Sequence, residues 1–229
     1  MITVIRRPRL PHIACIALSL AAIAAHARTI TFEDLGVMNA KAFTSNGFEF
    51  TTTGAGTPNA NIWNVAKYGP MCKPACPDSG STEFVAPVGP TVLTMQLPSG
   101  ATFSLESFLG AGGFNYNELG SDTAKWNGAT EIDVFGLLKS GSVVEQSFAI
   151  AETPTGPLPF TLDKLDASFG DVRAVSFVAN GAIELNSDGF ALDNIVVGSA
   201  IAPVPEPGSA ALLLAGMGLG LFVRRRALR

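Results

Sequence analysis

The chain has 229 residues and a formal net charge of −4 at pH 7, but residues 28–204 hold only eight Lys and Arg against 18 Asp and Glu. This body therefore carries a net charge near −10, which disfavours nucleic acid and anionic membrane surfaces as partners because both attract positive charge. Both histidines, His12 and His26, precede the body, so Ser-His-Asp triads, Cys-His pairs and His-bearing zinc sites are excluded from it.

Residues 1–27 have the pattern of a secretory signal peptide. Three arginines stand near its start, at Arg6, Arg7 and Arg9. An apolar run over residues 13–25 follows and ends in a small-residue site whose outer members are Ala25 and Ala27. This order is typical of an export signal, so we expect a signal helix and cleavage after Ala27. A permanent N-terminal anchor is the alternative.

The body, residues 28–202, shows almost no helical periodicity. Short alternating or β-branched runs recur, separated by Gly, Pro, Asn, Asp and Ser. We expect about nine strands, at residues 29–33, 47–51, 91–97, 101–108, 130–138, 143–150, 158–163, 172–179 and 190–197. Residues 139–142 have the length of a hairpin turn. The pattern predicts an all-β, antiparallel β-sandwich of jelly-roll type, and residues 53–82 are interpreted as a long irregular stretch.

Two cysteines remain in the body, Cys72 and Cys76, within a proline-rich segment. Two neighbouring thiols in an exported protein are expected to pair, so we predict a structural disulfide. A redox site is the weaker interpretation, because three residues separate the cysteines and the prolines disfavour a helix start.

The last 27 residues, 203–229, have three parts in fixed order. A triplet of Pro205, Glu206 and Pro207 comes first, and an uncharged run rich in Leu, Ala and Gly follows over residues 208–223. A basic cluster of Arg224, Arg225 and Arg226 ends the tail. As a helix the apolar run would reach about 24 Å, short for a hydrocarbon core of ~30 Å. We expect a short transmembrane helix whose arginines stay on the cytoplasmic side.

This tail resembles the PEP-CTERM sorting signal of exopolysaccharide-producing Gram-negative bacteria. The resemblance implies recognition and removal by an exosortase, a membrane protease, after transit through the inner membrane. It further implies a final place at the cell surface, in the outer envelope or in an extracellular polysaccharide matrix such as a biofilm. It concerns the address of the protein and leaves the activity of the body open. An ordinary tail anchor is the alternative.

A second resemblance concerns the two ends of the body. Phe190, Asp193, Asn194 and Ile195 form an F-x-x-D-N-I phrase that is similar to the closing strand of jelly-roll ectodomains and carbohydrate-binding modules. In such modules an acid near the first strand and an aspartate on the last often hold structural Ca²⁺. The resemblance implies Glu33 and Asp193 as calcium ligands. The alternative is that Asp193 caps backbone amides.

Exposed aromatic rings are the usual platforms for sugars, and Trp63, Tyr116 and Trp126 stand in Gly- and Asn-rich segments. They are candidate sugar contacts, with capping of the sandwich core as the alternative. A catalytic function would need a carboxylate pair, drawn from residues such as Glu118, Glu131 and Asp133. No motif singles out a pair, so we expect a non-catalytic structural or carbohydrate-contacting protein. A secreted glycoside-active enzyme is the alternative.

Overall fold

The computed structural model describes residues 27–54, 58–64, 79–113, 129–151, 159–181 and 189–199. These residues form 13 strands, and a short 3-10 helix, η2 (Ala167–Asp171), precedes one of them. Every pairing between the strands is antiparallel. The connections therefore need no parallel crossovers, as the short links in the sequence predict.

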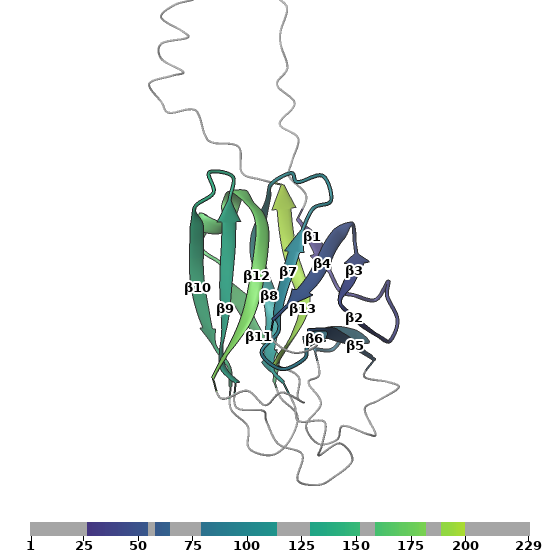
Figure 1. The fold of residues 1–229 in the computed structure, drawn as a ribbon. Helices are drawn as coiled ribbons and strands as arrows, with labels where there is room; N and C mark the ends of the chain where they lie inside the picture. The colour runs from purple at the N-terminus through teal and green to yellow at the C-terminus, as the bar shows by residue number, and fades with distance from the viewer. Residues whose placement is uncertain are drawn as a thin grey trace, which may run out of the picture.

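The strands form two layers that pack face to face (Figure 1). The layer that we call the β13 layer contains, in spatial order, β2 (Met38–Ala40), β5 (Ala60–Asn64), β6 (Glu83–Pro87), β13 (Phe190–Ser199), β8 (Phe103–Gly112) and β11 (Thr161–Lys164), with β1 (Arg28–Ile30) also beside β13. The layer that we call the β12 layer contains β3 (Ala42–Ser45), β4 (Phe48–Thr53), β7 (Val92–Gln96), β12 (Val172–Gly181), β9 (Ala129–Leu138) and β10 (Val143–Ala149). A single pair, Val172 with Phe103, links β12 to β8 and thus joins the two layers.

Phenylalanine rings fill the space between the layers. Phe108 of β8 meets Phe177 of β12 edge to face, with ring centroids 5.4 Å apart. Phe48 of β4 and Phe103 of β8 make a similar contact at 5.0 Å. All four side chains are at most 3% exposed. Burying each ring stabilises the fold by roughly 2–3 kcal/mol, so the apolar positions of the alternating strands supply the main cohesion between layers.

The structure confirms the predicted all-β, jelly-roll-like antiparallel sandwich, but two local predictions are wrong. Residues 60–64, expected to be irregular, form β5 and pair with both β2 and β6. The first strand ends at Ile30 instead of residue 33, because Phe32 turns to a φ of 61° and places its side chain in the core. A non-glycine residue with positive φ breaks the extended strand geometry.

Strand β13 contains an irregularity that shapes one side of the molecule. Its register with β8 shifts between Asp193 and Val196, and Asn194 has a φ of 45°. Before the shift, Leu192 pairs with Val85 of β6. Beyond Asn194, Ile195 pairs with Ile30 of β1 and Val197 pairs with Arg28. The bulge thus lets two different strands share one edge of β13, and Asp193 lies at the junction between them.

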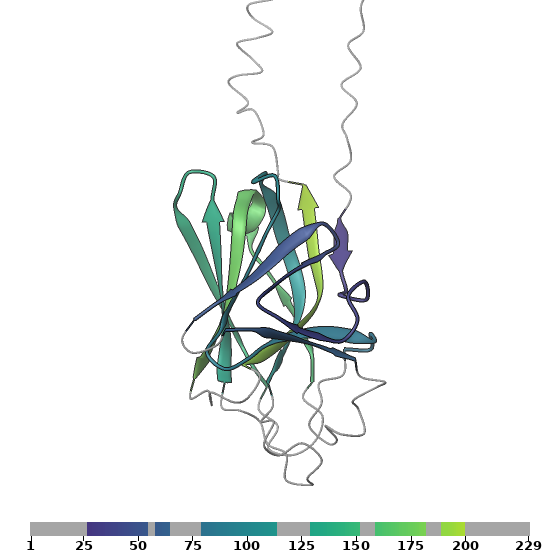
Figure 2. The same cartoon turned by 45° about the vertical axis from the view of Figure 1, so that its right-hand side comes forward.

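Both ends of the described chain leave the sandwich at the same end (Figures 1 and 2). Arg28, at the start of β1, pairs with Val197, and Ser199, at the end of β13, pairs with Phe103. The β7–β8 turn, the β9–β10 turn and η2 lie at this end too, next to the strand ends Phe103, Leu138 and Val172. We call it the terminal end of the sandwich.

Candidate functional site

Glu33 lies just after β1 and reaches the start of β6. Its Oε1 accepts hydrogen bonds from the backbone N–H groups of Thr82 at 2.7 Å and Glu83 at 2.9 Å. Glu83 is itself nearly buried, and its Oε2 accepts a hydrogen bond from the backbone N–H of Gly36 at 3.0 Å. The two carboxylates therefore hold the β1–β2 loop and β6 together, and they satisfy three backbone donors with charge-assisted bonds.

Asp193 lies on β13 and contacts the residues that precede β6. It is fully buried. Its Oδ2 accepts a hydrogen bond from the Ser81 hydroxyl. Its Oδ1 accepts a hydrogen bond from the backbone N–H of Asn194 at 2.7 Å. Burial raises the pKa of Asp193, and the charge of Glu33 raises it further. Hydrogen bonds from Ser79, Ser81 and the Asn194 amide oppose that rise in pKa by favouring the charged form.

The structure thus brings Glu33 and Asp193 to one junction, which is what the sequence resemblance implies for them. Calcium needs six to eight oxygen ligands, and the fit here is poor. Both side chains already accept hydrogen bonds from protein donors. Within the described ranges, no group of three or more His, Cys, Asp or Glu side chains is placed to hold a metal ion. The present contacts fit a hydrogen-bonded clamp between β1, β6 and β13.

Calcium binding at this junction is untested, and a thermal melt decides between it and the hydrogen-bonded clamp. The clamp predicts the same unfolding midpoint in EGTA and in Ca²⁺, because protein donors already bond to oxygens of Glu33 and Asp193. A midpoint that rises with Ca²⁺, and loses that rise in Asp193→Asn, would show instead that the two carboxylates are calcium ligands.

Trp63, one of the three predicted sugar contacts, lies on β5 and is half-buried. It packs against a small apolar cluster that contains Phe84 and Ala191. This position fits the core-capping interpretation, and the residue as a whole is not fully buried. Tyr116 and Trp126 lie outside the described residues.

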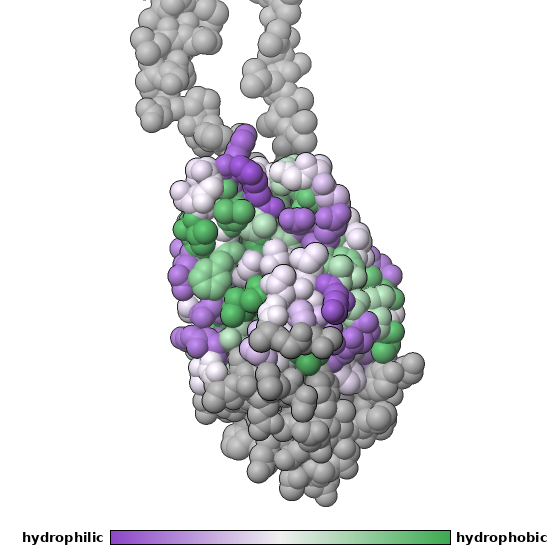
Figure 3. All heavy atoms as spheres, in the orientation of Figure 1, coloured by the Kyte–Doolittle hydropathy of each residue, from purple (hydrophilic) through white to green (hydrophobic). Residues whose placement is uncertain are grey.

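The outer face of the β12 layer carries a feature that the sequence interpretation missed. Strand register places the half-buried ring of Phe135 beside Ser176, and Ser176 beside Thr94. The hydroxyls of Thr94 and Ser176 are 2.8 Å apart and hydrogen-bonded. Figure 3 shows apolar and polar patches intermixed on this side of the molecule. The result is a broad surface on which an apolar ring and hydroxyl groups are side by side.

The alternation of buried and outward-facing residues in β9 indicates this surface in the sequence. The odd-numbered residues, Asp133, Phe135 and Leu137, face outward, whereas Val134 is fully buried. An aromatic residue on the outward set stands out in a strand whose core side chains are aliphatic. Sequence reasoning missed Phe135 because it looked for rings in loops.

The carboxylates considered for catalysis have ordinary partners. Glu131 accepts a hydrogen bond from the side-chain amide of Asn180 at 3.3 Å, and Asp133 accepts one from the hydroxyl of Ser147 at 2.6 Å. Both acids lie on the outer face of β9. Glu118 lies outside the described residues.

Among the described residues, Asp163 of β11 is an acid outside the junction whose pKa is clearly raised. Burial raises its pKa from 3.8 to about 6, and a weak hydrogen bond from Thr161 opposes the rise. Gly110 on β8 makes room for it, because a Cβ there would lie 2.7 Å from the Asp163 Oδ2 and 2.9 Å from the ring of Phe108. The side chain therefore sits at the edge of the core, beside an aromatic ring.

This ionisation predicts a pH-dependent stability. The folded protein holds the Asp163 proton more tightly than the unfolded chain, so the free energy of unfolding falls as pH rises from about 4 to about 6. We expect Asp163→Asn to be more stable than the parent at pH 7, by about 1 kcal/mol after allowance for solvent screening. Urea unfolding of both proteins at pH 4 and pH 7 checks this. A difference between them that does not change with pH would contradict it.

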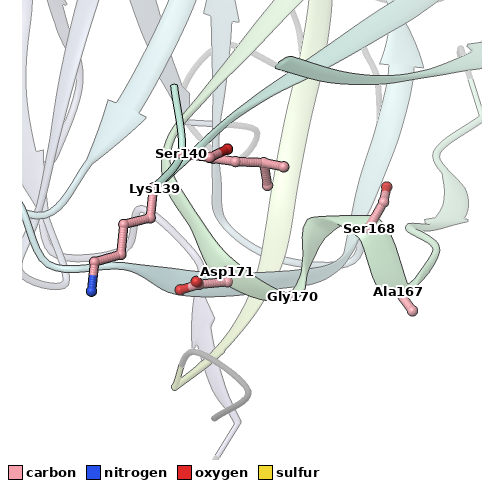
Figure 4. A pocket seen from close by; sticks show the side chains of 7 residues that line it. Lys139, Ser140, Ala167, Ser168, Gly170 and Asp171 are labelled. Atoms are coloured by element: carbon pink, nitrogen blue, oxygen red, sulfur yellow. The ribbon is translucent and has the colours of Figure 1, made fainter. Parts of the chain in front are cut away.

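A shallow depression lies at the terminal end, with a volume of about 450 Å³. Lys139 and Ser140 of the β9–β10 turn form one side of it, and η2 contributes Ser168 and Asp171 to the other (Figure 4). The depression is open to solvent. The residues that line it include neither the predicted calcium ligands nor the predicted sugar contacts. It shows that the β9–β10 turn and η2 are neighbours at this end.

Several predictions from the sequence lie outside the described residues. These are Ala25 of the signal cleavage site, the pairing of Cys72 with Cys76, and the tail from residue 203 onward. Within the described ranges, no helix is both long and apolar enough to cross a bilayer. The predicted spanning run at residues 208–223 lies outside those ranges.

Two solved structures illustrate a distant likeness. A DUF4465 family protein from Bacteroides ovatus has 6% sequence identity and a TM-score of 0.43, over 77% of this chain and all of that chain. The C-terminal family 22 carbohydrate-binding module of the Clostridium thermocellum xylanase 10B has 13% identity and a TM-score of 0.36, over 77% of this chain and 96% of that chain. TM-scores this low say nothing about what the present chain binds. No curated protein matches the sequence.

The sorting signal is the feature that comparison identifies. The family model described as the PEP-CTERM protein-sorting motif matches residues 203–226. The match covers the triplet, the apolar run and the three arginines in the predicted order. It begins four residues after the end of β13 at Ser199. The chain therefore carries a PEP-CTERM protein-sorting motif directly behind an antiparallel β-sandwich.

Proposed function

We propose that this is an exported, non-catalytic β-sandwich protein that an exosortase releases at the Pro205-Glu206-Pro207 triplet and that then contacts extracellular polysaccharide. The observation that carries the proposal is the sorting motif at residues 203–226. The motif implies export and membrane transit. The destination that we propose is the outer envelope or a polysaccharide matrix, where the acidic body stays soluble.

The outer face of the β12 layer supports the polysaccharide contact. Sugars present flat C–H faces and a rim of hydroxyls, and Phe135 with its neighbours Ser176 and Thr94 offers an apolar ring beside hydroxyl groups. The net charge near −10 of the body repels acidic polymers, so we infer a neutral polysaccharide as the partner. Trp63 is a second candidate contact, at the β5–β6 side of the other layer.

Binding to a neutral β-glucan, measured by affinity electrophoresis or calorimetry, tests this contact. We expect Phe135→Ala to weaken binding between about twofold and tenfold, taking the roughly 0.5–1.5 kcal/mol of an aromatic ring contact as the scale. The matched control is Leu162→Ala, which removes an exposed apolar side chain from β11 of the other layer. Equal binding by the parent and Phe135→Ala would reject this face as the sugar contact.

A glycoside-active enzyme is the competing proposal. It would release reducing sugar from the same glucan and lose that activity when Glu131 or Asp133 is replaced by the corresponding amide. Binding without release of reducing sugar would support the non-catalytic function.

A further inference from the structure

The pairing of β1 with β13 sets the orientation of the body relative to its tail. Ser199 ends β13 at the terminal end of the sandwich, and a link of residues 200–207 separates it from Gly208, where the apolar run begins. Eight residues reach at most about 29 Å when fully extended. While the tail is in the bilayer, the terminal end must therefore stay within this distance of the membrane surface.

The opposite end of the sandwich lies about one strand length away from the terminal end. Strand β12 runs from Val172 at the terminal end to Gly181 at the other end. Ten extended residues span about 30 Å, so the far end could reach the membrane only if the link were fully extended back along the sandwich. The topology thus distinguishes a membrane-near end from a membrane-far end.

The surface at the terminal end has an amphipathic tip. Val143 and Leu137 are cross-strand partners beside the β9–β10 turn, and their side chains are 61% and 40% exposed. Lys139, at the turn itself, is exposed, and its carbonyl accepts a hydrogen bond from the exposed Arg173 guanidinium at 2.7 Å. Two apolar side chains next to two cations suit the interface between lipid chains and phosphate headgroups.

We propose that the β9–β10 tip, defined as Leu137, Lys139, Val143 and Arg173, contacts the lipid surface while the sorting tail still holds the protein. The short link supplies a high effective concentration, so a weak contact is sufficient. Removal of the tail abolishes that advantage. The net charge near −10 of the remaining body then favours departure from an anionic bilayer. Cleavage would thus free both the chain and its docked end. The proposal rests on a tail held in the membrane, as assumed under the proposed function.

Fluorescence quenching tests this orientation. The signal-processed chain with its tail is placed in vesicles of phosphatidylethanolamine and phosphatidylglycerol whose headgroups carry a nitroxide quencher. A fluorescent amino acid stands either at Ser140, in the β9–β10 turn, or at Asn180, near the far end of β12. We expect several-fold stronger quenching at Ser140. Equal quenching at the two positions, or stronger quenching at Asn180, would overturn the proposal.

Two variants separate lipid contact from mere proximity. The double variant Leu137→Ser, Val143→Ser is expected to lower the quenching at Ser140 without changing retention of the tail, which vesicle flotation measures. Leu162→Ser is the control, because it removes a side chain of similar exposure, 58%, from the β11 edge. Quenching at Ser140 that is unchanged in the double variant would overturn the tip contact. Loss of flotation in the parent would instead show that the tail is not held, which is a failure of the sorting proposal.

Discussion

Asp193→Ala is expected to lower the free energy of unfolding by about 2 kcal/mol. The substitution removes the acceptor of the Asn194 amide, and it leaves the Ser81 hydroxyl with only the Ser79 hydroxyl and the Glu83 carbonyl as partners. Unsatisfied buried donors cost roughly 1–3 kcal/mol each. The loss also loosens the bulge that holds β1 and β6 along one edge of β13. Urea unfolding at pH 7 measures the effect.

Asp193→Asn separates the hydrogen bonds of this residue from its charge. Asparagine keeps one acceptor oxygen and removes the cost of burying a carboxylate, the cause that raises the pKa of Asp193. We therefore expect a change within about 1 kcal/mol. Asp133→Ala is the matched control, because Asp133 is half-buried on the outer face and has Ser147 as its partner. An alanine variant of Asp193 that is as stable as that control would contradict the clamp.

Replacement of Pro205, Glu206 and Pro207 by alanines is expected to abolish release of the protein. These residues lie at the start of the matched sorting motif, which is the feature that we propose the exosortase recognises. The apolar run and the arginines remain in the variant, so the chain should stay in the membrane fraction at full length. Fractionation of the native host, followed by immunoblotting, measures this outcome.

A control variant makes the triplet experiment specific. Replacement of Pro203 alone alters the link before the triplet and leaves Pro205, Glu206 and Pro207 in place. We expect that variant to be released like the parent. Release of the triple-alanine variant at the parental rate would show that another feature directs processing.

The parts of the fold that follow local rules were predictable from the sequence. The β9–β10 hairpin is the clearest case, since alternation over residues 130–138 and 143–150 brackets a turn, where Gly141 adopts a φ of 89°. Strand β6 was missed because its residues are buried throughout and show no alternation. Strand β5 is short and lies in a stretch rich in turn residues, so its pairing partners, not its own pattern, make it a strand.

The residues of the candidate site were predictable in part, because local sequence patterns reveal some of them and not the long-range pairing that places the others. The resemblance at the two ends of the body pointed to Glu33 and Asp193, and the structure places them at one junction. The sequence did not reveal the segment between them, because Ser81 bonds to Asp193 across 112 positions of the chain. Nor did it reveal the outward position of Phe135, which depends on the register of β9 with β12. Long-range pairing is set by the fold as a whole and leaves little local pattern.

The most direct measurement is the intact mass of the protein isolated from its native host, combined with sequencing of both terminal peptides. We expect a mature chain that begins at Arg28, the first residue of β1, and ends within residues 204–208, just beyond β13. The β-sandwich would then be released whole, without the signal peptide or the arginine cluster. A mature chain that still carries residues 212–229 would contradict sorting by removal of the tail and would identify the protein as permanently anchored.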